Sequence, residues 1–202
     1  MFKIDHLMIE VDDPLETANN VVARLALPLA WPLVEKDEYT SIGVNFGDIN
    51  IEFIKFKLRF GIKNTKFKGF SGIAYKTMDS LEEIIKRLNV AKINHRVGEA
   101  CEAHTTLPIA ENDVFPTIFI VKYHFDTSGW VERLKNEFAE YAGGNYHIGN
   151  FKSMVIATEV SESLKKEFNI NSGAKNKVFF SSANGENIVI SDLIENLEIV
   201  IS

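Results

Sequence analysis

The first residues of the chain alternate between apolar and polar side chains. Over residues 3–11 this alternation predicts a strand with one buried face. Asp12-Asp13-Pro14 follows, and it combines a strand end, a helix N-cap residue and a proline suited to a first helical turn. Apolar residues then recur at helical spacing from Leu15 to Leu25, so we predict a helix that packs on the sheet.

Two further strands complete this first unit. Residues 27–32 form an apolar, proline-containing segment that we interpret as a loop. Residues 39–46 and 49–56 are strand-like, and the two residues between them, Gly47 and Asp48, are a good hairpin signal. Residues 1–58 are therefore predicted to form a β-α-(β)-β-β module.

The pattern recurs when the chain is shifted by 66 positions. In the second module, residues 69–125, we predict an opening strand over 70–77, a helix over 81–88 and a closing strand over 117–123. Residues 94–113 are polar and irregular, and they form either a functional loop or a poorly ordered one. A linker helix is expected over 130–141, within residues 126–145.

A third, partial module is predicted over residues 146–202. Its expected elements are a strand at 154–157, a helix at 161–168 and strands at 178–180, 188–190 and 197–201. A βαβββ module leaves one sheet face apolar and must bury that face against another module. The predicted fold class is therefore α+β, with modules pairing into curved sheets around a cleft, where a small-molecule ligand is expected.

Composition and charge narrow the function. The 202 residues are 46% hydrophobic, and the single cysteine, Cys101, excludes an intramolecular disulfide and a cysteine-based metal cluster. No apolar run approaches the roughly 18 residues needed to cross a bilayer, and the amino terminus lacks signal-peptide features, so we expect a cytoplasmic protein with no membrane partner. The net charge of −6 disfavours nucleic acid, and the lysine-rich stretch 55–68 is interpreted as a solvated linker.

Two stretches of the first module carry a resemblance to a known family. Residues 4–13, Ile-Asp-His-Leu-Met-Ile-Glu-Val-Asp-Asp, precede the predicted helix, and residues 43–54, Gly-Val-Asn-Phe-Gly-Asp-Ile-Asn-Ile-Glu-Phe-Ile, follow it. In this order they resemble the glyoxalase-like domain of the vicinal oxygen chelate superfamily, which includes glyoxalase I, extradiol dioxygenases and antibiotic-resistance proteins. Residues 69–125 resemble the domain less closely, and residues 146–201 only in outline.

The resemblance implies a metal site shared by two modules. In metal-dependent members the opening strand supplies a histidine and the closing strand a glutamate, and here His6 and Glu52 match those positions. Such a pair suits Zn, Mn, Fe or Ni, and Glu52 could also act as a general base. The second module departs from the pattern, because Gly72 stands where the second histidine belongs and Val121 or Lys122 near the second glutamate.

Other side chains are candidates without a family position. His124 could supply a third metal ligand, and His95, His104 and His147 are further histidines. Trp31 and Tyr123 are expected to contact substrate, and Phe119, Phe125 and Trp130 are aromatic residues that could line the same pocket. A Cys101–His104 nucleophile is disfavoured because Glu99 and Glu102 would raise the thiol pKa. Asp12, Asp13 and Asp37 fit no EF-hand spacing.

Three functions remain open from sequence. The first is a divalent-metal-dependent lyase, isomerase or dioxygenase that uses His6 and Glu52. The second is a metal-free protein that binds a small ligand, as resistance-type members do, and the third is a degenerate structural domain without catalysis. A homodimer would suit the superfamily, whose members often pair modules between chains.

Overall fold

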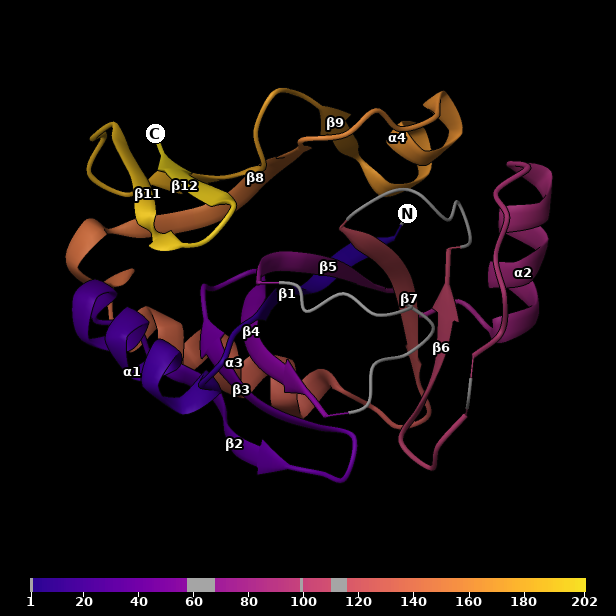
Figure 1. Ribbon diagram of the computed structural model, residues 1–202, viewed down its shortest axis with the longest axis horizontal. Helices are drawn as coiled ribbons and strands as arrows, with labels where there is room; N and C mark the ends of the chain where they lie inside the picture. Colours follow the sequence, from indigo (N-terminus) through magenta and orange to yellow (C-terminus); the bar gives the residue numbers. More distant parts are fainter. Residues whose placement is uncertain (1, 58–67, 99, 110–115) are drawn as a thin grey trace.

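The computed structural model describes residues 2–57, 68–98, 100–109 and 116–202 (Figure 1). The central region of the lysine-rich stretch and part of the 94–113 segment therefore lie outside the described residues. The elements run in the order β1 Lys3–Glu10, α1 Pro14–Leu25, β2 Leu29–Glu35, β3 Tyr39–Asn45, β4 Asn50–Phe56, β5 Gly69–Lys76, α2 Leu81–Val90, β6 His104–Pro108, β7 Thr117–Tyr123, α3 Ser128–Glu140, the 3₁₀ turn η1 Gly144–Tyr146, β8 Ile148–Ile156, α4 Glu162–Phe168, β9 Ile170–Ser172, β10 Lys177–Ser182, β11 Ile188–Ile194 and β12 Leu197–Ile201.

The strands of the described residues form two sheets. One has the order β2-β3-β4-β1-β5-β7-β6 and the other β11-β12-β10-β8-β9. Within the larger sheet the opening strands β1 and β5 pair antiparallel, while β1 pairs parallel with β4 and β5 pairs parallel with β7. The first two units are thus joined edge to edge, and the orange and yellow strands of the smaller sheet form a separate layer (Figure 1).

Two sequence interpretations need correction. Trp31 and Pro32 lie in strand β2 rather than in a loop. Among the described strands β2 lies at the edge of the sheet and pairs only with β3, in an irregular ladder, so it tolerates proline. The 94–113 segment contains strand β6, which pairs with β7. Upstream of β6 the described backbone forms isolated bridges, His95 with Ile109 and Ala100 with Thr105, and the Arg96 and Gly98 N–H groups donate to backbone oxygens of β6. No regular strand is described there.

Helices α1 and α2 begin at the residues that cap them. The Asp13 carboxylate accepts a hydrogen bond from the Glu16 N–H, and Pro14 occupies the first helical turn. Ser80 and Glu83 form a reciprocal capping box at the start of α2. The apolar faces of both helices, which include Val21, Leu25, Ile84 and Leu88, are buried in the core.

One apolar core joins the two sheets. Phe46, at the end of β3, stacks on Phe180 of β10 with ring centroids 5.8 Å apart. The Tyr75 hydroxyl of β5 donates to the backbone oxygen of Phe168 at 2.8 Å, and Phe168 also stacks on Phe2. Residues from both sheets belong to a single buried cluster, so the smaller sheet and α4 cover the larger sheet on the face that also receives α1 and α2.

A bulge in each opening strand sets which residues face away from this core. The β1–β5 ladder skips Asp5 on β1 and Ser71 on β5, two positions exactly one repeat of 66 residues apart. A bulged residue breaks the alternation of side chains, so Phe2 and Ile4 before the bulge and Leu7 and Ile9 after it all enter the core. Asp5 and His6 consequently share the opposite face, the site face.

These observations confirm the predicted α+β class. Among the described residues no helix is both long and apolar enough to cross a membrane.

Candidate functional site

The site face of the larger sheet carries a buried network of charged side chains centred on Asp5. Asp5 is 1% exposed. Its Oδ2 atom lies 2.9 Å from His6 Nδ1 and accepts a 2.9 Å hydrogen bond from the Tyr123 hydroxyl, and its Oδ1 atom lies 2.6 Å from Lys76 Nζ. Three neighbouring strands, β1, β5 and β7, therefore place these groups around one carboxylate.

Glu52 completes the network from strand β4. Ile51 and Phe53 are buried in the core, so Glu52 between them projects from the site face, as strand alternation predicts. Its Oε2 atom lies 3.5 Å from His6 Nε2, a longer separation than a normal N–H···O hydrogen bond. His6 Nε2 and the Glu52 carboxylate are thus neighbours that both keep hydrogen-bonding capacity.

The pKa values of Asp5 and His6 both favour the ionised form. Burial by itself raises the pKa of Asp5, but His6 and Lys76 outweigh burial and hold that pKa well below its usual value. Burial likewise lowers the pKa of His6, but the hydrogen bond to Asp5 and the charge of Glu52 raise it above its usual 6.5. Because ionised Asp5 can only accept, His6 Nδ1 must be the donor in their hydrogen bond.

Aromatic side chains surround His6. The ring centroids of Trp31 and Phe119 lie 6.1 Å and 6.0 Å from that of His6, both edge-on. Trp130 of α3 packs against Trp31 at 6.4 Å and against Tyr123 at 6.2 Å. The Trp31 and Phe119 rings therefore flank His6, and the His6 and Glu52 side chains are both only about one-seventh exposed.

Helix α3 closes part of the site face. Asn45 of β3 donates through Nδ2 to the backbone oxygen of Leu134 at 2.7 Å, which fixes the helix across β3. A groove of about 440 Å³ lies between β2 and α3, and Trp31 lines it together with Arg133 and Tyr141. Trp31 therefore lines this groove and also contacts the His6 ring.

Gly43 explains how Trp31 reaches its position. Gly43 pairs with Glu52 across β3 and β4, and a Cβ atom at Gly43 would lie 2.5 Å from the Trp31 indole. Any larger residue at position 43 would force either the Trp31 indole or the β3 backbone to move. The indole therefore lies flat on the sheet because position 43 is glycine.

Comparison with solved structures shows a common architecture. A hypothetical protein from Staphylococcus aureus matches with a TM-score of 0.64 at 12% identity, over 100% of this chain and 99% of that chain. Homoprotocatechuate 2,3-dioxygenase from Arthrobacter globiformis matches with a TM-score of 0.57 at 10% identity, over 99% and 79%. A variant of that enzyme from B. fuscum, solved in complex with HPCA, matches at 0.60 and 11%, over 100% and 71%.

These matches show that this chain has a glyoxalase-like fold, which it shares with the two dioxygenases. No protein-family model and no curated protein matches the sequence. At 10–12% identity the structural matches establish the fold, and the site must be judged on its own residues.

Donor side chains occupy half of the four positions that the sequence resemblance implies as metal ligands. His6 pairs with Asn50 across β1 and β4, and Gly72 pairs with Thr117 across β5 and β7. Glu52 lies two residues after Asn50 in β4, and Phe119 lies two residues after Thr117 in β7. The register therefore makes Phe119 the counterpart of Glu52, which corrects the sequence assignment of Val121 or Lys122. Neither Gly72 nor Phe119 carries a donor side chain.

The remaining candidate ligands do not complete the set. His124 follows Tyr123 and hydrogen-bonds through Nε2 to Thr105 Oγ1 at 3.0 Å. His95 contacts the Ile93 backbone oxygen at 3.0 Å, His104 lies 3.5 Å from Cys101 Sγ, and His147 is exposed after η1. Across the described ranges no three His, Cys, Asp or Glu side chains are grouped to hold a metal ion. Two protein ligands are fewer than the three of a normal catalytic metal site.

Sequence reasoning placed Trp31 and Tyr123 at the site, and the structure brings both of them to the His6 network. It missed Asp5, Lys76 and Gly43. A signal for Asp5 was available, since strict alternation would have directed a charged residue at position 5 into the core with Leu7 and Ile9. Lys76 and Gly43 have no comparable sequence signal, because their roles depend on neighbouring strands.

The stability of the protein should depend on pH through this network. A raised pKa means that His6 stabilises the fold fully below pH 6.5, and that this contribution is lost as pH rises through the folded-state pKa. The lowered pKa of Asp5 gives a contribution that is present above pH 3.8 and is lost on further acidification. We expect the free energy of unfolding in urea to fall as the pH rises above about 6.5, because His6 has a raised pKa in the folded state.

The His6→Gln variant provides the control for this pH dependence. It lacks the titrating imidazole, so its free energy of unfolding should change less over the same alkaline range. An equal slope in both proteins would show that another group causes the decline.

Proposed function

We propose that the protein binds a small, uncharged aromatic molecule on the site face, without a resident metal ion. The observation that carries this proposal is the pairing of His6 Nε2 with Glu52 beside the aromatic rings of Trp31 and Phe119. Binding sites for small molecules combine apolar and aromatic walls with a few polar groups that fix orientation. We also propose, as expected from the sequence, that the protein is located in the cytoplasm.

The charges of the network support an uncharged ligand. Asp5 and Glu52 contribute two negative charges when ionised, and His6 and Lys76 contribute two positive charges when protonated. An additional charge at this buried place would be costly because, among these four described side chains, each charge already has an opposite partner. A neutral hydroxyl or amide can instead donate to Glu52 and accept from His6 Nε2.

Asn50 supports a ligand that donates hydrogen bonds. It lies beside His6 in the β1–β4 register and is 5% exposed. Within the described part of the chain its side-chain oxygen has no hydrogen-bond partner. A buried acceptor without a partner costs about 1–3 kcal/mol, so a donor brought by a bound molecule would stabilise this side of the site.

The replacement of the second ligand pair favours binding over metal-dependent catalysis. Phe119 occupies the glutamate-equivalent position and presents its ring to His6. A phenylalanine in place of a carboxylate removes a metal ligand and adds an apolar wall. We therefore derive no reaction step through a metal ion.

Tryptophan fluorescence tests the proposal directly, because the chain contains only two tryptophans and both belong to the site. We expect uncharged phenols and benzamides to change the emission of Trp31 and Trp130 with saturable dependence on concentration. Cyclohexanol, which lacks the aromatic ring, should bind at least about tenfold more weakly. The ligands should also raise the midpoint of thermal unfolding.

Two glycine variants form a matched pair for this test. Gly43→Ala should displace the Trp31 indole and weaken phenol binding by about tenfold or more, because the new Cβ would overlap the ring. Gly129→Ala, where a Cβ meets nothing within 4 Å, should bind like the unaltered protein. No saturable change with any phenol or benzamide, or equal weakening in both variants, would contradict the proposal. Tight Zn²⁺ binding that is lost in His6→Gln would also overturn it in favour of a metal site.

A further inference from the structure

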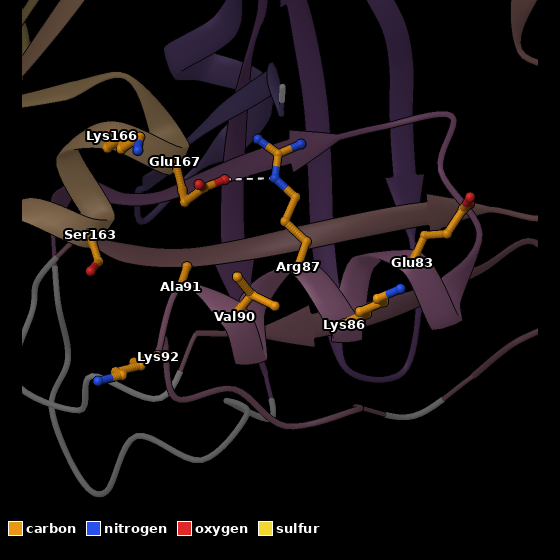
Figure 2. Close-up of a pocket in the computed structure, with 9 residues that line it drawn as sticks. All are labelled: Glu83, Lys86, Arg87, Val90, Ala91, Lys92, Ser163, Lys166 and Glu167. Atoms are coloured by element: carbon orange, nitrogen blue, oxygen red, sulfur yellow. Dashed lines mark hydrogen bonds and ion pairs between the residues drawn. The ribbon is translucent and has the colours of Figure 1, made fainter.

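A second hollow lies between helices α2 and α4 (Figure 2). It measures about 600 Å³. Its lining residues are Glu83, Lys86, Arg87, Val90, Ala91, Lys92, Ser163, Lys166 and Glu167. We call this hollow the α2–α4 groove.

The sequence spacing of the two helices builds the groove. On α2, Glu83, Arg87 and Val90 recur every three or four residues, so they lie on one face, while Ile84 and Leu88 turn toward the core. On α4 the groove takes Ser163, Lys166 and Glu167 by the same spacing, while Leu164 and Phe168 are buried. The hollow is thus lined by the solvent-side faces of two helices that the core holds in place.

One ion pair fixes the two walls together. The Arg87 Nε atom donates to Glu167 Oε2 at 2.6 Å, and Figure 2 shows this contact crossing from α2 to α4. The Arg87 guanidinium also lies over the Phe2 ring, 4.5 Å from its centroid. Arg87 therefore acts as a positioning residue that keeps the groove at its observed width.

The charge of the lining is opposite to that of the whole protein. The chain has 22 Lys and Arg against 28 Asp and Glu. The groove has four cationic side chains and two acidic ones, and both acidic ones are already engaged, Glu83 by the backbone and hydroxyl of Ser80 and Glu167 by Arg87. Within the described residues Lys86, Lys92 and Lys166 form no ion pair.

We propose that the α2–α4 groove binds a small, multiply charged oxyanion, of the class of organic phosphates and polycarboxylates. The three lysines supply the attraction, and a hollow between two low-dielectric walls strengthens their field relative to a flat surface. The Ser163 hydroxyl adds a neutral donor, and Val90, which is 78% exposed, offers an apolar surface for the carbon part of such a molecule. Neither His6 nor Glu52 takes part, so this proposal is independent of the proposed function.

Calorimetric titration of the full chain with pyrophosphate and with citrate tests this inference. We expect saturable binding of both probes that weakens as sodium chloride is added, because exposed charges are screened within about 10 Å at 0.1 M salt. Each of Lys86→Gln, Lys92→Gln and Lys166→Gln should weaken binding by roughly threefold to tenfold. Tight binding of pyrophosphate alone would assign the groove to phosphates, and tight binding of citrate alone would assign it to carboxylates.

Lys135→Gln is the matched control. Lys135 is exposed on α3 and lies outside the groove, so its variant loses the same charge without changing the lining. Equal weakening in Lys135→Gln would show that binding follows overall charge and would overturn the proposal. The absence of saturable heat for either probe up to about 10 mM would overturn it as well. All four substitutions are at exposed lysines, so thermal unfolding should confirm that each variant folds.

Discussion

Replacement of Asp5 by alanine is expected to lower the free energy of unfolding by about 3–5 kcal/mol, one of the largest losses for a single substitution in this chain. The carboxylate is buried and contacts His6, Lys76 and the Tyr123 hydroxyl. Its removal leaves these groups without their shared partner in a place that water reaches poorly. Urea unfolding followed by circular dichroism measures the change.

Asp37→Ala is the control for this experiment. Asp37 is exposed between β2 and β3, so its variant should stay within about 0.5 kcal/mol of the unaltered protein. A similarly small change in Asp5→Ala would mean that Lys76 and Tyr123 find other partners. In that case the network would not hold β1, β5 and β7 together.

The second large effect is expected at the contact between the two sheets. Phe46→Ala should lower the free energy of unfolding by about 3–5 kcal/mol, because it removes a fully buried ring and leaves a cavity. The stack of Phe46 on Phe180 joins the end of β3 to β10, so the smaller sheet should also lose protection from hydrogen exchange. Both quantities can be measured on the same variant.

Phe125→Ala removes a ring of the same size from the surface. Phe125 is 53% exposed and contacts the Tyr123 ring, so we expect a loss of at most about 1 kcal/mol. If the two variants lost equal stability, the interface between the sheets would not depend on the Phe46–Phe180 stack.

Local patterns predicted the helices and most of the strands. Alternation marked β1, and Asp13-Pro14 placed the start of α1 correctly because the cap and the proline act within one turn. Residues 27–32 were interpreted as a loop, although the β-α-(β)-β-β pattern allowed a strand before residue 39. Pro32 cannot donate a hydrogen bond to a strand ladder, and only its place at the sheet edge makes it tolerable. Edge position is a property of the whole sheet and cannot be deduced from a short segment.

In the candidate site, too, the sequence predicts some residues, while others depend on how distant strands pair. The resemblance selected His6 and Glu52, and the structure places their nearest side-chain atoms 3.5 Å apart. The counterpart of Glu52 was assigned wrongly because the length of chain between β5 and β7 hides the register, which only the pairing of Gly72 with Thr117 reveals. Lys76 escaped notice because its partner, Asp5, is far away in sequence and belongs to another strand.

The paired bulges at Asp5 and Ser71 have a consequence for any molecule bound on the site face. Two copies of one scaffold meet there about a shared pseudo-twofold axis, yet one copy offers an imidazole and a carboxylate while the other offers a bare backbone at Gly72 and a benzene ring at Phe119. Because the backbone is symmetric there but the side chains differ, the two halves of the surface would contact different ends of a bound ligand. An elongated ligand would therefore bind in one orientation, with its polar end toward the module that carries His6 and Glu52.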